Sequence, residues 1–115
     1  MVRIDITKHA YDRMKQRLGW NKKAAKRMAG VAYAEGIKHG ETNGKLHSYI
    51  SSRALTYMKK GNCIKIYGEA VYCFVNRKDD ETGELFAILI TVWNIPWKYR
   101  SQVLGIQRRK KDRVS

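Results

Sequence analysis

Three side chains that could act on a phosphate recur every four residues near the start of the chain: His9, Arg13 and Arg17. In a helix this spacing places them on one stripe, at the border of an apolar face. That apolar face consists of Ala10, Met14 and Leu18, with Tyr11 beside them. A histidine at such a border can exchange protons near neutral pH, and an arginine can hold a phosphate through two hydrogen bonds. The plainer alternative is two solvated arginines and a histidine packed beside the helix start.

The helices that would position this stripe are marked by local signals. Two of them have a side chain able to cap the first turn and a glycine at the end. They span 8–18, between Thr7 and Gly19, and 22–35, between Asn21 and Gly36. A third helix is predicted over 45–60, where apolar residues recur at helical spacing.

Beyond residue 62 the apolar pattern changes to a period of two, which is typical of strands. The predicted strands cover 63–67, 70–75 and 85–93, and the last is apolar on both faces and therefore central. Gly68 stands at the first position of a two-residue loop, which favours a type II′ hairpin turn. The sequence thus predicts an α+β fold, with two or three N-terminal helices packed on one face of a three- or four-stranded antiparallel sheet. A single domain spans 1–106, and 107–115 is a basic tail that we expect to be mobile.

The strand register gives the predicted sheet two different faces. One is apolar and carries Ile64, Ile66, Val71, Cys73, Val75, Phe86, Ile88, Ile90 and Val92. The other carries Lys65, Tyr67, Tyr72, Phe74, Thr91 and Trp93. Aromatic rings beside a lysine and a hydroxyl group offer nucleobases a surface for stacking. The alternative is that another element, such as segment 97–106, covers this face.

Charge is distributed unevenly along the chain, whose formal net charge is +14. Residues 1–40 carry ten basic and three acidic residues, a net charge of +7, and 41–62 add a net +3. The strand region 63–97 is at −2, and 98–115 is at +6, with Arg108, Arg109, Lys110 and Lys111 in a row. A neutral sheet beside basic helices and a basic tail favours nucleic acid as the partner. An acidic protein and a membrane surface remain as the alternatives.

Several function classes find no support in the sequence. The longest apolar stretch, 85–93, is half the length of a membrane span, and the first residues lack the apolar core of a signal peptide. We therefore expect no membrane partner and an intracellular, cytoplasmic location. Cys63 and Cys73 fit no zinc pattern. The hairpin register sets Cys73 opposite Ile64, so both cysteines are interpreted as reduced core thiols. The sequence predicts no metal and no cofactor.

Three segments together resemble a known group of proteins: ITKHAYDRMKQRLG, KIYGEAVYCFV and ILITVWNIP. They are similar to small phage and mobile-element proteins of the superfamily that contains RelE-like toxins, colicin-type tRNases and barnase-like ribonucleases. The resemblance covers residues 4–18 and 63–96 and leaves 36–60 unmatched.

The resemblance implies an α+β fold whose cleft, between the first helix and the sheet, binds RNA. Active members cleave RNA without metal: the 2′-OH attacks the adjacent phosphate, while an acid, a base and cations assist. Carried over by position, His9 would be the general acid or base, Arg13 and Arg17 would stabilise phosphate, and Thr91 would add a polar group. The chain shows no evident acid–base partner for His9, because His39 and His47 lie in unmatched sequence and Glu69 lies in a turn.

The expected function is that of a nucleic-acid-binding protein of phage or mobile-element type, with RNA favoured over DNA. Whether it is also a metal-independent RelE-like endoribonuclease is left open by the missing partner of His9. The alternative is a non-enzymatic, phage-encoded anti-defence inhibitor that binds a host CRISPR-type complex or another nucleoprotein complex. The residues expected to bind nucleic acid are Lys65, Tyr67, Tyr72, Trp93, Arg108, Arg109, Lys110 and Lys111.

Overall fold

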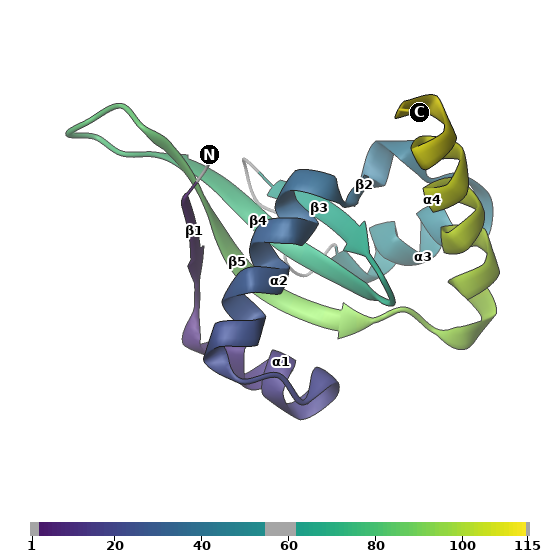
Figure 1. Cartoon of the computed structure of the whole chain (residues 1–115), viewed down its shortest axis with the longest axis horizontal. Helices are drawn as coiled ribbons and strands as arrows, with labels where there is room; N and C mark the ends of the chain where they lie inside the picture. The colour runs from purple at the N-terminus through teal and green to yellow at the C-terminus, as the bar shows by residue number, and fades with distance from the viewer. Residues whose placement is uncertain (1–2, 55–61, 115) are drawn as a thin grey trace.

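A five-stranded sheet forms the centre of the computed structural model, which describes residues 3–54 and 62–114 (Figure 1). The strand order is β1-β5-β4-β3-β2; β1 runs parallel to β5, and the other neighbours are antiparallel. The strands span Arg3–Ile6 (β1), Ile37–Lys38 (β2), Asn62–Tyr67 (β3), Ala70–Lys78 (β4) and Leu85–Asn94 (β5). The helices span Lys8–Leu18 (α1), Lys22–Glu35 (α2), Gly44–Ala54 (α3) and Arg100–Val114 (α4), with 3-10 turns at His39–Glu41 (η1) and Trp97–Tyr99 (η2).

The α+β class is confirmed, but the purely antiparallel sheet of three or four strands is wrong. The sequence did not reveal β1 and β2, because strands of four and two residues are too short to show a period of two. β5 lies inside the sheet as expected, although the middle strand is β4. α3 ends its described course at Ala54, so the rest of the predicted helix 45–60 lies outside the described residues.

The ends of α1 and α2 lie where the capping residues in the sequence predicted them. The Thr7 and Asn21 side chains accept hydrogen bonds from the Ala10 and Ala24 amides, at 3.1 and 2.8 Å. Gly19 ends α1 in the left-handed region at φ 69°. Gly36 ends α2 for another reason: its φ is −64°, but an added Cβ would lie 2.9 Å from Lys65 Cβ. Glycine at position 36 thus lets the end of α2 approach β3.

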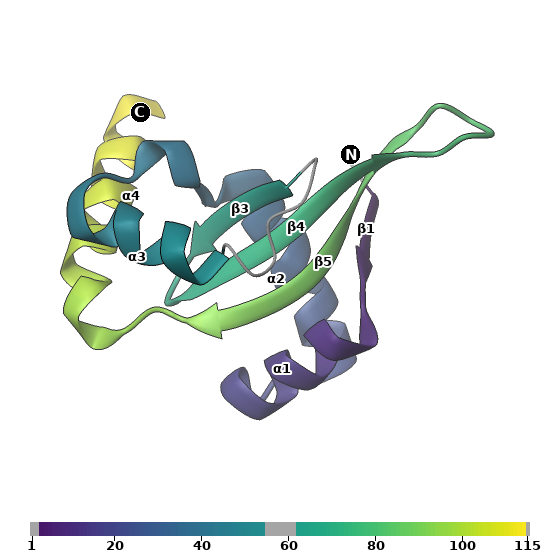
Figure 2. The ribbon, with the colours of Figure 1, turned by 180° about the vertical axis from the view of Figure 1, so that it is seen from behind.

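Helices cover both faces of the sheet, so the expectation of helices on one face is wrong (Figures 1 and 2). Strand β4 requires this cover, because Ala70–Val75 are all buried and point alternately to the two faces. α1 and α2 pack on the face that carries Tyr72, Phe74 and Leu89. α3 and α4 pack on the face that carries Ile66, Val71 and Trp93, through Leu46, Ile50, Val103 and Ile106.

A bulge in β5 changes the face on which its last residues lie. Cys73 pairs with Thr91, but Phe74 pairs with Leu89, so Ile90 is the extra residue. Past this point the alternation is inverted, and Thr91 and Trp93 share the face of Cys73 instead of the face of Tyr72. The single two-residue alternation assumed from the sequence was wrong for this part of β5.

Helix α1 covers the edge of β5 where β1 stops pairing at Leu89. The Thr7 hydroxyl donates to the carbonyl of Ile90 at 3.3 Å, which satisfies an acceptor beside the bulge. Near the other end of α1, the Arg17 guanidinium donates to the carbonyl of Val92 at 3.0 Å. Two side chains of the helix therefore bond to carbonyls of β5 beyond the end of β1.

Residues 107–114, expected to form a mobile tail, continue α4 as helix across the proposed domain boundary at 106. At the opposite end, the β4–β5 hairpin projects beyond the helices (Figure 1). Its turn is held by the Asp79 carboxylate, which accepts from the Glu81 and Thr82 amides at 2.8 and 3.2 Å. This turn gathers Asp79, Asp80, Glu81 and Glu84. The acidic hairpin tip and the basic helices are therefore separate in space.

The bond between Arg17 and β5 predicts that two arginines of α1 differ in their effect on stability. Arg17→Ala should lower the free energy of unfolding by about 1–3 kcal/mol, because a part-buried carbonyl loses a charged donor. Arg13→Ala removes the same group from the same helix and should cost less than about 0.5 kcal/mol. Urea denaturation of both variants measures the difference; equal losses would contradict the role given to Arg17.

Candidate nucleic-acid interface

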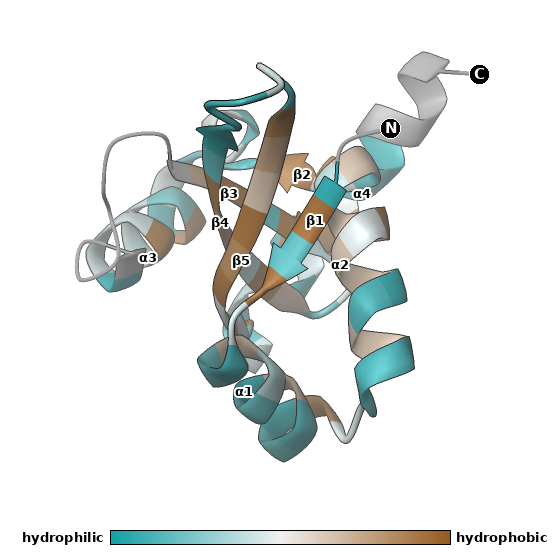
Figure 3. Ribbon diagram, turned by 90° about the vertical axis from the view of Figure 1, so that its left-hand side faces the viewer, coloured by the Kyte–Doolittle hydropathy of each residue, from teal (hydrophilic) through white to brown (hydrophobic). Residues whose placement is uncertain are grey.

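The outward side of α1 and α2 carries exposed cations, which we call the α1–α2 basic surface. Its members are Lys8, Lys15, Lys22, Lys23, Lys26 and Arg27. None of the six forms an ion pair with the side chains that the structure describes, those of residues 3–53 and 63–109. Figure 3 shows the hydrophilic turns of these helices beside the hydrophobic strands. Uncompensated positive charge of this kind attracts a polyanion.

A groove of about 910 Å³ between α2 and β1 extends the α1–α2 basic surface. Lys26 and Arg27 line it from the helix, and Arg3 lines it from the strand. Asp5 and Glu35 also line it, and the Asp5 carboxylate lies 3.4 Å from the Arg3 guanidinium. Its walls also include Ile4, Val31 and Ala34, so apolar, cationic and acidic side chains line it together.

The stripe predicted on α1 is present, but its members do different things. His9 is exposed and accepts a 3.5 Å hydrogen bond from Arg13 Nε. Arg17 bonds to the Val92 carbonyl and is part of the fold. Thr91 is 2% exposed and lies on the other face of the sheet. The structure therefore brings His9 and Arg13 together and separates them from Thr91 by the sheet.

The aromatic face expected to stack nucleobases is packed beneath α2. Tyr72 is fully buried, and burial, followed by the nearby Tyr67, raises the pKa of its hydroxyl well above the ordinary value. Lys65 is 8% exposed, and its Nζ lies 5.6 Å from the ring centroid of Tyr33 on α2. Tyr67 is half-buried in the same cluster. These three residues form core packing.

The remaining predicted binding residues lie on the α3–α4 side. Trp93 is buried there, with the Arg53 guanidinium 5.2 Å from its ring centroid. Arg108 and Arg109 are exposed on α4. Lys110 and Lys111 belong to the same helix, and their side chains lie outside the described part. The cations of α4 and those of α1 are thus on opposite sides of the sheet.

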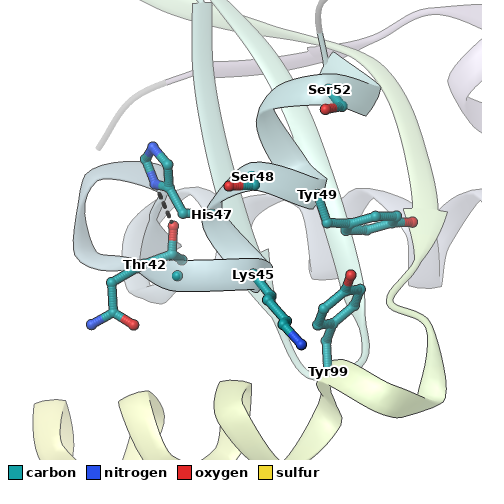
Figure 4. Close-up of a pocket in the computed structure, with 9 residues that line it drawn as sticks. Thr42, Lys45, His47, Ser48, Tyr49, Ser52 and Tyr99 are labelled. Atoms are coloured by element: carbon teal, nitrogen blue, oxygen red, sulfur yellow. Dashed lines mark hydrogen bonds between the residues drawn. The ribbon is translucent and has the colours of Figure 1, made fainter.

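A pair of histidines between η1 and α3 was not anticipated as a unit. The rings of His39 and His47 stack with centroids 4.1 Å apart and planes within 9°. His39 Nε2 lies 3.0 Å from Ser51 Oγ, and His47 Nδ1 lies 3.0 Å from Thr42 Oγ1 (Figure 4). Burial, and then the charge of His47, lower the pKa of His39. The sequence contained one signal for this pair: His47 lies in the first turn of the predicted helix 45–60, which begins shortly after the loop that contains His39.

A shallow groove of about 790 Å³ runs beside this pair, along the start of α3. Tyr49 of α3 and Tyr99 of η2 stack with centroids 4.9 Å apart, and Lys45 extends toward Tyr99 (Figure 4). Gln102 of α4 donates to the Asn43 carbonyl at 2.8 Å, which fixes α4 to the loop before α3. Sequence reasoning missed this groove because the contact between α3 and α4 is long-range.

Other classes of site find no geometric support. Within residues 3–54 and 62–114, no group of three or more histidines, cysteines or carboxylates converges as metal ligands. Both cysteines are free, Cys73 faces Ile64 as expected, and burial raises the pKa of its thiol to about 12. In the same described part, no helix is long and apolar enough to cross a bilayer.

Comparison with models of known protein families, with characterised proteins and with solved structures finds no match to this chain.

The His39 environment predicts a pH dependence of stability. The folded-state pKa of His39 lies below its ordinary value of 6.5, so the unfolded chain binds this proton more readily. Stability should therefore fall as the pH drops through 6.5 toward the lower folded value. Between about pH 7.5 and about pH 5.5, His39→Gln should lose less free energy of unfolding than the wild type does, because the glutamine cannot be protonated.

The measurement is urea denaturation at several pH values, with His9→Gln as the variant that removes an exposed imidazole. A wild-type pH dependence that His39→Gln leaves unchanged would contradict the assignment.

Proposed function

We propose that this protein binds nucleic acid, with RNA as the favoured partner, through the α1–α2 basic surface. The observation that carries the proposal is the set of six exposed cations that have no ion-pair partner among the described residues. The resemblance of residues 4–18 and 63–96 to RNA-acting proteins supports RNA over DNA. It also supports an origin in a phage or mobile element.

The way α2 packs explains why its charge points outward. Ala25, Ala29 and Ala32 are buried against the sheet at helical spacing. Small side chains bring the helix close to the strands. At helical spacing Lys23 and Arg27 lie on the side opposite these alanines, and Lys22 and Lys26 lie along its flank. Lys22, Lys23, Lys26 and Arg27 lie within two turns. A helix with this pattern is stabilised by one face and presents charge on the other.

The acidic hairpin tip supports an orientation for a bound polyanion. Asp79, Asp80, Glu81 and Glu84 lie on the projecting end of β4 and β5, away from the helices (Figure 1). Phosphates are repelled there and attracted at the α1–α2 basic surface. The separation of the two charges favours a defined position of the nucleic acid on the protein.

Binding without cleavage is the reading that the α1 geometry supports. General acid–base cleavage needs two proton-transfer groups within reach of one phosphate. His9 contacts Arg13, Arg17 is engaged with β5, and Thr91 is on the other face of the sheet. The alternative, an inhibitor of a nucleoprotein complex, would use the same cations to occupy the RNA-binding surface of its target.

The first test is the salt dependence of binding to a labelled oligoribonucleotide, followed by fluorescence anisotropy. If about six phosphates are neutralised, the slope of log affinity against log salt should be near −4. The double variant Lys23→Gln/Arg27→Gln should remove about two phosphate contacts. The salt slope should therefore become less steep, and binding should weaken roughly tenfold at low salt.

The matched control removes two cations from the base of the acidic hairpin. Arg77→Gln/Lys78→Gln should leave affinity and slope near the wild-type values. The absence of wild-type binding at about 50 mM salt would overturn the nucleic-acid proposal and favour the inhibitor. Equal losses in the two double variants would overturn the assignment to α2.

The second test addresses catalysis directly. Wild-type protein incubated with mixed-sequence RNA in EDTA at neutral pH should leave the RNA intact. His9→Ala should retain RNA affinity, and Arg13→Ala should lower it, because a phosphate contact acts in the ground state. Cleavage by the wild type that is lost in His9→Ala at unchanged affinity would instead establish a proton-transfer role for His9.

A further inference from the structure

The turn η2 and the first residue of α4 alternate aromatic and cationic side chains in the sequence Trp97-Lys98-Tyr99-Arg100. Trp97 is 79% exposed, the highest exposure among the large hydrophobic residues of the described chain. An exposed indole offers a partner a large flat apolar surface, and tryptophan is enriched at binding interfaces. Within this turn Tyr99 packs against the core on the α3–α4 side, whereas Trp97 is exposed and lies outside the α1–α2 basic surface.

Arg100 holds the turn in place. Its guanidinium lies 3.3 Å from the Glu69 carboxylate, in the turn between β3 and β4, and 5.4 Å from the ring centroid of Trp97. The ion pair fixes the arginine to the sheet, and the arginine in turn supports one side of the indole. The indole is therefore pre-positioned while most of its surface stays open.

The groove beside η2 supplies further aromatic and cationic groups. Tyr99 stacks on Tyr49 of α3, and Lys98 Nζ lies 5.2 Å from the Tyr99 ring centroid. Lys45 lines the same groove and extends toward Tyr99 (Figure 4). Rings next to lysines are the combination with which proteins bind unpaired nucleotides, because rings accept bases and ammonium groups accept phosphates.

The charge of the segments around η2 and α3 favours an anionic ligand. Residues 43–54 and 95–111 contain no aspartate or glutamate, and they contain eight lysines and arginines. Five of the eight are exposed and described in the structure: Lys45, Arg53, Lys98, Arg108 and Arg109. A partner that offers both flat apolar rings and negative charge is a nucleic acid strand with unpaired bases.

We propose that η2 is a stacking site for unpaired RNA, where a base packs on Trp97 and the adjoining phosphates contact Lys98 and Lys45. The inference rests on the proposed function and narrows its substrate class, because paired bases in a duplex are not available for stacking. It adds a second RNA contact on the α3–α4 side, distinct from the α1–α2 basic surface.

The experiment compares two single strands of equal length, an oligouridylate and the same backbone without bases. Wild-type protein should bind the base-bearing strand about tenfold more tightly than the abasic strand, because one stacked base is lost. Binding of the oligouridylate should also quench tryptophan fluorescence. In Trp97→Leu the two strands should bind equally, and the quenching should be smaller than in the wild type, because Trp20 and Trp93 still fluoresce. The exposed position of Trp97 lets this variant fold.

Phe86→Leu is the matched control. Phe86 is likewise an aromatic ring beside an arginine, with the Arg3 guanidinium 4.3 Å from its centroid, but it lies at the start of β5, the end of the strand away from η2. It should keep the wild-type preference for bases. Equal, salt-dependent affinity of wild-type protein for both strands would overturn the stacking site and leave the proposed function intact. Quenching as large in Trp97→Leu as in the wild type would also overturn the stacking site. Failure of both strands to bind at low salt would overturn the proposed function, and the stacking site with it.

Discussion

Strand β4 imposes the constraint on which the rest of the molecule depends. Six successive residues, Ala70–Val75, are buried, and because a strand points its side chains to both sides, both faces of the sheet must be covered. α1 and α2 cover one face and α3 and α4 cover the other. Polar and charged side chains are consequently placed on the outward faces of helices and at the hairpin tip. The charge pattern of the surface thus follows from the packing of the core.

Elements whose ends are set by neighbouring residues were predicted well from the sequence. The caps Thr7 and Asn21 and the glycine after α1 act within a few residues, so the sequence located α1 and α2 at their observed bounds. The β3–β4 register was equally local, because a two-residue turn with Gly68 determines it. These elements needed no information from distant parts of the chain.

Long-range pairing decided the features that the sequence did not predict. β1 exists because β5 offers it an edge, and the Ile90 bulge is accompanied by a bond from Thr7, more than eighty residues earlier in the chain. Because of that bulge, Thr91 and Trp93 lie on the face of the sheet opposite α1. Arg17 donates a hydrogen bond to the β5 backbone and so belongs to the fold. Of the four residues predicted for the site, only His9 and Arg13 therefore lie together. Tertiary contacts, which the sequence did not show, form the His39–His47 pair and position η2.

We propose that the separation of charge directs RNA to the helices, with an additional contact at η2. This can be tested by titrating the protein with a single-stranded oligoribonucleotide and following its amide nitrogen–proton correlation spectra. We expect shifts concentrated in α1, in α2 and at the indole N–H of Trp97, with the hairpin tip from Asp79 to Glu84 unchanged. Shifts centred on that acidic tip, or none at all during the titration, would contradict it.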